Sequence, residues 1–429
     1  MKKIFAILLC GGCAVGLNSC FMEDEDVFND TSAVRSNNTI ESYAELLPSA
    51  PNGWVMEYFV GDAYPGYPML VKFDKDMNVT IAAKGTPTAD DYTEESSTYD
   101  LITDQGPVLT FDTYNSLIHV FADPYLPEFQ LNGIGYGGDY EFVIVESGDG
   151  YVRMKGKKYG LEIYLYQLPA DQPWDTYYDK IDEIKAQMFN SLVPELYFTA
   201  GGEKYTVSGM SDGVFQFLIE GGDPLSQVIS SAFVVRLDGT IHLCTPFTGL
   251  NDKFSVREFK FSEDGSALNC IDEGQSAAIT APDAVTIFTD QSSEWQIDAS
   301  TFTGNFVNLY QAVVNDTRTA IGSAFSYFGF TYSAADGYAV ITHNGRARGL
   351  YYSENAVVDD STVSVTLTGE TDRNAQNDVG RIPSIKAFVD YLASSQYTVT
   401  VEGNRIMPVR LKFVSKTNPG DSFMVDKTK

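Results

Sequence analysis

With 429 residues the chain exceeds the length at which one hydrophobic core keeps growing, so two or three domains are expected. Hydrophobic residues make up 44% of it and aromatic residues 13%, which excludes a disordered chain, and the aromatics are mostly Phe and Tyr, as in β-sheets. The 29 basic and 58 acidic residues give a formal net charge of −29, which excludes nucleic acid as a partner because phosphate binding needs clustered Lys and Arg.

Residues 1–19 are typical of a signal peptide. Lys2 and Lys3 supply a basic start, and the apolar run that follows is shorter than the roughly 20 residues that span a bilayer. Ser19 directly precedes Cys20, and Leu17 lies three residues before it, a pattern that resembles a bacterial lipobox. We therefore predict cleavage after residue 19 and attachment of acyl chains such as palmitate at Cys20, which would anchor the protein in the outer-membrane lipid. An ordinary signal peptide with a chance cysteine is the alternative.

Residues 20–31 form the predicted lipidated tether, which carries the four consecutive acids Glu23, Asp24, Glu25 and Asp26. Clustered like charges repel one another and favour an extended, solvated linker. The same acids resemble the export tag of surface lipoproteins in the Bacteroidota. That resemblance implies an outer-membrane protein that faces the cell exterior.

The segment 32–170 is predicted to be a helix followed by an antiparallel β domain. Residues 32–47 carry apolar side chains on one face, and Pro48 ends the helix. Alternating apolar residues then predict strands separated by tight turns. The expected strands are residues 54–58, 69–73, 79–81, 108–112, 117–121, 140–146, 151–155 and 161–168, and a mobile polar loop is expected at 85–98.

The remainder is predicted to hold a connecting helix (171–195), a second β domain (196–290) and a C-terminal β domain with one helix (291–429). Pro173 opens the connecting helix and Pro194 closes it. Short strands joined by glycine turns are typical of meanders, and a mobile loop is expected at 369–378. The predicted fold class is mainly β with a minor α+β component, in antiparallel meander barrels or sandwiches with about three packed helices.

The cysteines leave one question open. Cys10 and Cys13 leave with the signal peptide, so Cys244 and Cys270 are the thiols of the folded part. In a simple meander these two lie two strands apart, roughly 10 Å, beyond the limit of about 7 Å between the Cα atoms of a disulfide. A bridge would require strands that face each other across a barrel or sandwich.

The sequence around each candidate catalytic or metal motif argues against that assignment. Residues 209–213 match a nucleophile elbow around Ser211, but strand-like sequence follows where a helix is needed, so a hairpin turn is favoured. The glycine-rich residues 133–138 and the acidic residues 74–78 fail in the same way as dinucleotide and calcium sites. The only histidines, His119, His242 and His343, are isolated, so we predict no metal site, no cofactor and no catalytic residue. Carboxylate pairs remain open because sequence does not measure their separation.

Four tyrosines on glycine- and proline-bearing loops are candidate ligand-binding residues. Flat rings stack on sugars or contact protein partners with little loss of entropy. The alternative is that they seal the ends of the barrels. The candidates are Tyr64, Tyr67, Tyr125 and Tyr136.

Four segments resemble an uncharacterised lipoprotein family of the Bacteroidota, domain of unknown function 4302. They are NGWVMEY at 52–58, DQGPVLTFDTYN at 104–115, GGDYEF at 137–142 and MKGKK at 154–158. The family has no established activity, and its members resemble accessories of TonB-dependent importers and their binding lipoproteins. The resemblance therefore implies a non-catalytic surface protein that binds a glycan, a peptide or a protein partner during nutrient uptake. The alternatives are a surface-anchored hydrolase of glycans or peptides and a structural or adhesive protein.

Overall fold

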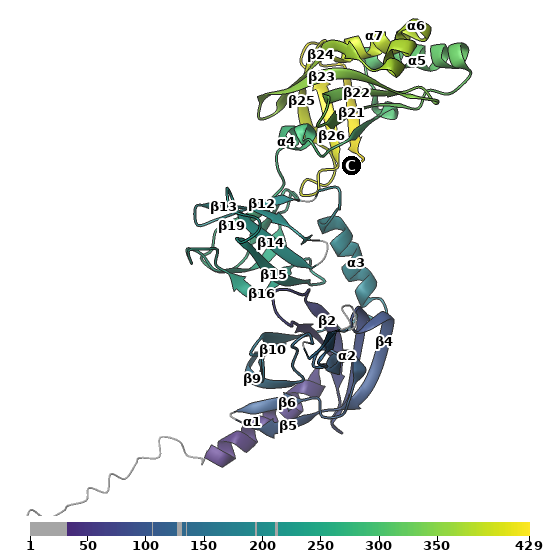
Figure 1. Ribbon diagram of the computed structural model, residues 1–429. Helices are drawn as coiled ribbons and strands as arrows, with labels where there is room; N and C mark the ends of the chain where they lie inside the picture. The colour runs from purple at the N-terminus through teal and green to yellow at the C-terminus, as the bar shows by residue number, and fades with distance from the viewer. Residues whose placement is uncertain (1–31, 105, 127–130, 134, 194, 211–212) are drawn as a thin grey trace, which may run out of the picture.

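The computed structural model of the chain describes residues 32–104, 106–126, 131–133, 135–193, 195–210 and 213–429. Their strands form a nine-stranded sheet, a two-stranded sheet and two closed eight-stranded barrels. Figure 1 shows these β units one after another along the chain, with α1 at one end and the second barrel at the other. The prediction of a mainly β fold built from antiparallel meanders is confirmed. Within the described part of the chain, no helix combines the length and apolarity needed to cross a membrane.

The nine-stranded sheet has the order β4-β3-β2-β1-β11-β10-β9-β6-β5. One face carries the alternating apolar residues of its strands, among them Trp54, Met56 and Tyr58 of β1, and buries them in the first core. The elements of this domain are α1 (Ser32–Leu46), the 3-10 helix η1 (Leu47–Ser49), β1 (Trp54–Tyr58), β2 (Tyr67–Phe73), β3 (Asn78–Gly85), β4 (Ala89–Thr98), β5 (Asp100–Thr103), β6 (Pro107–Thr110), α2 (Ser116–His119), β7 (Tyr125–Leu126), β8 (Leu131–Asn132), β9 (Glu141–Gly148), β10 (Tyr151–Gly156) and β11 (Glu162–Gln167).

Two predictions in this domain are wrong. The loop expected at 85–98 is largely the edge strand β4, whose backbone pairs with β3 while its charged side chains face solvent, as is common at sheet edges. The strand expected at 117–121 is instead the short helix α2. Asn115 caps it by accepting a hydrogen bond from the Leu117 amide, a local signal that outweighs the apolar run.

Helix α3 (Tyr177–Met188) lies on the other face of the sheet, where Tyr177 and Ile181 pack against Leu70 and Leu168. Lys84 of β3 adds ion pairs to Asp179 (3.2 Å) and Asp182 (3.3 Å) of the helix. The predicted connecting helix therefore covers part of the sheet face that the first core leaves open.

The first barrel follows α3. Its interior is filled by aromatic rings, with Phe198 at 5.4 Å from both Phe217 and Phe247. Cys244 on β16 and Cys270 on β18 are separated by β17 and are both free thiols, in agreement with the distance argument against a bridge. The strands are β12 (Leu196–Ala200), β13 (Glu203–Ser208), β14 (Val214–Ile219), β15 (Val228–Val235), β16 (Ile241–Phe247), β17 (Val256–Phe261), β18 (Ala267–Cys270) and β19 (Ala277–Thr280).

The second barrel carries most of the helices. Phe328 of a strand stacks on Phe388 of α7 at 3.9 Å, which joins the helical layer to the barrel core. The elements are α4 (Ala284–Thr289), β20 (Trp295–Asp298), the 3-10 helix η3 (Ala299–Thr301), α5 (Asn305–Ile321), β21 (Tyr327–Ser333), β22 (Gly337–His343), β23 (Arg348–Asp359), β24 (Thr362–Thr371), α6 (Arg373–Arg381), α7 (Pro383–Leu392), β25 (Gln396–Val401), β26 (Arg410–Ser415) and β27 (Ser422–Lys427).

The prediction of one helix in this domain is wrong. Helix α5 was not expected because its polar surface obscures the spacing of its buried residues Phe306, Val313 and Ile321. The loop expected at 369–378 is the end of β24 followed by α6, which Asp372 caps by accepting a hydrogen bond from the Ala375 amide.

The two barrels are joined by the loop between β25 and β26, residues 402–409, here called the inserted loop. Its Ile406 and Met407 are buried in the core of the first barrel. Asn404 donates a hydrogen bond to the carbonyl of Gln187 at the end of α3 (2.5 Å), and Arg405 pairs with Asp264 (2.9 Å). The relative position of the barrels is therefore set by core packing as well as by the linker between them.

Candidate functional site

The junction between the nine-stranded sheet and the first barrel places the buried Glu57 and His242 among further charged side chains. Adjacent strands β1 and β11 point Glu57, Glu162, Tyr164 and Tyr166 away from the first core, because these residues alternate with the core residues. That outward face lies against the barrel, so Glu57 is only 1% exposed. A strand position that reads as solvent-facing in the sequence is thus an interdomain position.

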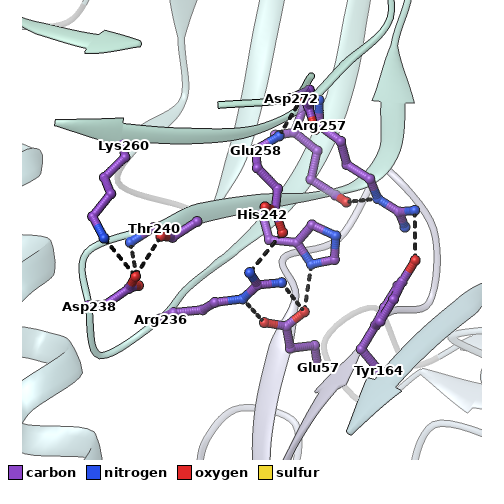
Figure 2. Close-up of polar contacts among 11 residues, drawn as sticks. Glu57, Tyr164, Arg236, Asp238, Thr240, His242, Arg257, Glu258, Lys260 and Asp272 are labelled. Carbon is purple, nitrogen blue, oxygen red and sulfur yellow. Dashed lines mark hydrogen bonds and ion pairs between the residues drawn. The ribbon is translucent and has the colours of Figure 1, made fainter. Parts of the chain in front are cut away.

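Glu57 is bound by two side chains of the barrel, Arg236 and His242 (Figure 2). Arg236 donates to both carboxylate oxygens, from Nε at 2.5 Å and from Nη2 at 3.2 Å, and the Nδ1 atom of His242 lies 2.5 Å from Oε2. Arg236 also donates from Nη1 to Glu258 (2.7 Å), and its guanidinium lies 4.3 Å from the centre of the Tyr166 ring. We call Glu57, Arg236, His242 and Glu258 the junction network.

The electrostatics of Glu57 show why the network is stable. Burial raises the pKa of its carboxyl, but the charges and hydrogen bonds of His242 and Arg236 outweigh burial and hold the pKa below its ordinary value of 4.5. Glu57 is therefore ionised at neutral pH inside the junction. A bidentate arginine pair with further hydrogen bonds on both partners is the arrangement that offsets the cost of burying charge.

A second arginine of the barrel repeats the pattern beside it. Arg257 donates to Glu162 of β11 (2.6 Å) and to the hydroxyl of Tyr164 (3.1 Å), and it also donates to the carbonyls of Leu243 and Cys244. Glu162 is shared with Arg153 of β10 (2.8 Å). The sheet thus presents two carboxylates to two arginines of the barrel.

The loop after β1 completes the junction. Asp62 accepts hydrogen bonds from the Ala232 amide (3.1 Å) and from the Thr245 hydroxyl (2.7 Å), and the Gly66 amide donates to the Phe233 carbonyl (3.2 Å). A Cβ atom at Gly66 would lie 2.9 Å from that carbonyl oxygen, so only glycine permits this approach. Residues 61–67 are therefore a contact between domains.

A cavity of about 330 Å³ opens beside this junction, between β2, β3, α3 and the barrel, and we call it the first junction cavity. Its wall includes Tyr67, Lys84, Asp182 and Lys185. Lys84 is occupied by its ion pairs to α3, whereas the Lys185 ammonium has no hydrogen bond or ion pair within the described residues. Burial lowers the pKa of Lys185, and Asp182 only partly opposes this. A partly buried ammonium without a hydrogen-bond partner favours a ligand that supplies a hydrogen-bond acceptor.

The structure places the predicted site residues in three groups: residues outside the described part, tyrosines that pack against other rings, and one exposed tyrosine. Cys20 and Glu23, Asp24, Glu25 and Asp26 lie outside the described residues. Tyr136 is buried, and the rings of Tyr64 and Tyr67 pack beside it on Tyr136 and Phe121.

Tyr125 is 39% exposed and remains a candidate for contact with a ligand. Of the four tyrosines, Tyr67 is the one that also belongs to the wall of the first junction cavity.

The structure shows what the rejected calcium-loop and nucleophile-elbow motifs form where their residues are described. Residues 74–78 form a turn in which Asp74 accepts from the amides of Asp76 and Asn78. Residues 209–213 connect the paired strands β13 and β14, with Ser211 outside the described residues. Among the described residues, no group of three or more His, Cys, Asp or Glu side chains has the geometry of a metal site.

Sequence reasoning missed Glu57, Arg236 and His242. A charged residue in the otherwise apolar segment 54–58 was the available signal, and it does not reveal the partner. Both oxygens of Glu57 already accept hydrogen bonds, so the junction network positions the domains. The first junction cavity lies beside it and contains Lys185.

The chain matches the family described as Domain of unknown function (DUF4302) over residues 24–263. It belongs to this family. The matched segment contains the nine-stranded sheet, α3 and strands β12 to β17, so the family definition includes the junction network. No curated protein matches the chain.

Solved structures give only distant similarity. The β chain of DNA polymerase III from Streptococcus pneumoniae is 12% identical, with 91% of this chain and 98% of that chain covered and a TM-score of 0.11. Transferrin binding protein B from Neisseria meningitidis is 9% identical, with 84% and 65% covered and a TM-score of 0.14. Similarity at these TM-scores carries no information on the fold or function of this chain.

Proposed function

We propose that this protein is a lipid-anchored, outward-facing outer-membrane protein that binds a ligand or partner without catalysis, as an accessory of a TonB-dependent nutrient-uptake system. The lipobox-like Cys20 and the acidic residues behind it support the anchor. Helix α1 directly follows the tether and lies at the end of the molecule away from the second barrel (Figure 1). An anchor there would leave both barrels reaching away from the membrane.

The observation that carries the binding function is the first junction cavity. Pockets at domain interfaces are common ligand sites, and 330 Å³ is at the small end of their usual range. The junction network holds the sheet against the barrel without using Lys185, so the site is preorganised, and the Lys185 ammonium has no hydrogen bond or ion pair among the described residues although Asp182 lies in the same wall.

The anchor is tested by metabolic labelling with an alkyne analogue of palmitate. The wild-type chain should incorporate the label and Cys20→Ser should not, while Cys244→Ser serves as the matched control and should label normally. Protease treatment of intact cells should then cut the protein. A labelled Cys20→Ser variant or complete protection on intact cells contradicts the proposal.

The binding role is tested by recovering the lipidated protein from gently solubilised outer membranes and identifying what accompanies it by mass spectrometry. A TonB-dependent transporter and its binding lipoprotein are the expected companions. Lys185→Met should reduce a ligand-dependent shift in melting temperature, and Lys75→Met, on an exposed turn, should not. Recovery of the protein alone, with no ligand effect, favours a hydrolase or an adhesin.

A further inference from the structure

The junction between the two barrels forms a second and larger cavity, of about 630 Å³ and open to solvent on one side, which we call the second junction cavity. It lies where β12 of the first barrel, the linker with α4, and β27 of the second barrel meet. Figure 1 shows α4 at this junction. Its polar wall includes Glu195, Tyr197, Thr286, Asp290 and Lys427.

Lys427 is the unusual member of this wall. The residue is 7% exposed, yet its ammonium forms no hydrogen bond or ion pair within the described part of the chain. The ring of Trp295 lies beside the ammonium, with its centre 6.0 Å from Nζ. The Nζ atom of Lys427 is not among the fully buried polar atoms that lack a partner, so the ammonium keeps access to solvent at the cavity wall and can donate to a ligand there.

Burial also lowers the pKa of Lys427, and Asp290 opposes that effect from beyond ion-pair distance. Lysine at this position therefore weakens the folded state in the absence of a ligand. Residues of this kind are typical of binding sites, where stability is lost in favour of function.

The carboxylates in the wall of the second junction cavity limit which class of ligand it can bind. Glu195 has no hydrogen bond or ion pair among the described residues, and Asp290 accepts only from Ser292. One ammonium and two carboxylates give the wall a net charge of −1, which disfavours an anion. Hydroxyl groups suit it because each can accept from Lys427 and donate to Glu195 or Asp290.

We propose that the second junction cavity binds a neutral saccharide, with Lys427 donating to its hydroxyl oxygens and Glu195 and Asp290 accepting from its hydroxyl groups. The volume is within the range of 300–1,000 Å³ for small-molecule sites and admits an oligosaccharide of two or three units. This inference rests on the proposed binding function but concerns a different junction from the first cavity.

The test is a calorimetric titration of the full lipidated chain in a zwitterionic detergent that has no sugar headgroup. The probes are neutral trisaccharides of glucose, mannose, galactose and xylose, with trigalacturonic acid as the charged comparison. At least one neutral trisaccharide should bind, and trigalacturonic acid should bind more weakly. Fluorescence of Trp295, which contacts Lys427, should change on binding.

Two variants connect binding to the cavity. Lys427→Met should weaken the affinity by about tenfold or more, because it removes a charged donor. Its melting temperature should equal or exceed that of the wild type, since a largely buried lysine side chain is replaced by an apolar one. Glu195→Gln, at an exposed position, should also weaken binding. Lys429→Met is the matched control outside the cavity and should bind normally.

Absence of binding by every neutral trisaccharide overturns the inference, as does unchanged affinity in both Lys427→Met and Glu195→Gln. Tighter binding of trigalacturonic acid than of the neutral sugars also overturns it. A negative result in this titration does not affect the labelling of Cys20 or the partners recovered from the membrane. It is therefore distinguishable from failure of the proposed function.

Discussion

Replacing Glu57 by Gln tests whether the junction network holds the first sheet and the first barrel together. Glu57 is 1% exposed and accepts hydrogen bonds from Arg236 at 2.5 and 3.2 Å and from His242 at 2.5 Å. Gln keeps the shape but removes the charge and turns an amide toward the two donors. Removing one partner of a buried ion pair costs ~3–5 kcal/mol.

We expect the lower end, about 3 kcal/mol, because Arg236 keeps Glu258 as a partner and its side chain is 23% exposed. Urea unfolding followed by far-ultraviolet circular dichroism measures the loss. Glu146→Gln is the control, since Glu146 pairs with Arg153 at a side-chain exposure of 48% and should cost less than about 1 kcal/mol. A loss at Glu57 no larger than at Glu146 would refute the reasoning.

The stability difference between the wild type and the same variant should depend on pH. Because the pKa of Glu57 is held below 4.5 in the folded protein, its stabilisation is fully present above pH 4.5 and is lost as the pH falls through the folded pKa. The difference in unfolding free energy between wild type and Glu57→Gln should therefore be constant from pH 5 to 7, roughly, and shrink below pH 4.5. A difference that grows on acidification contradicts the assigned direction.

Three further predictions concern the cores and the thiols. Ile406→Ala should lower the free energy of unfolding by ~2–5 kcal/mol, because the side chain is fully buried in the other barrel. A loss below about 1 kcal/mol in a urea titration would contradict the packing of the inserted loop in the core of the first barrel. Burial raises the pKa of both Cys244 and Cys270 to about 12, so Ellman's reagent at pH 8 should modify them only after unfolding, and rapid reaction of the native protein would contradict this. Gly138→Ala should lower the melting temperature, since the added Cβ would lie 2.3 Å from the Tyr58 hydroxyl and 2.5 Å from the Phe121 Cβ; an unchanged melting temperature is the contrary outcome.

Local patterns were sufficient for elements whose signal lies within a few residues. The alternation of Trp54, Met56 and Tyr58 predicts β1 and its buried face, and glycine turns predict the hairpins that close into barrels. Where two local signals compete, sequence reasoning erred. The cap at Asn115 produces α2 in place of a strand, and ladder pairing along β3 orders the polar segment that becomes β4.

The sequence by itself determined the mainly β architecture, the helices α1, α3 and α7 and the family resemblance, because apolar spacing and short motifs are local properties of the chain. Only the tertiary structure decided the junctions. Glu57 meets His242 across 185 positions of sequence, Ile406 enters a barrel that ends near residue 280, and Lys427 is buried where two barrels meet. Glu57 looks like a solvent-facing position within its own strand, since the surface that buries it belongs to a different domain.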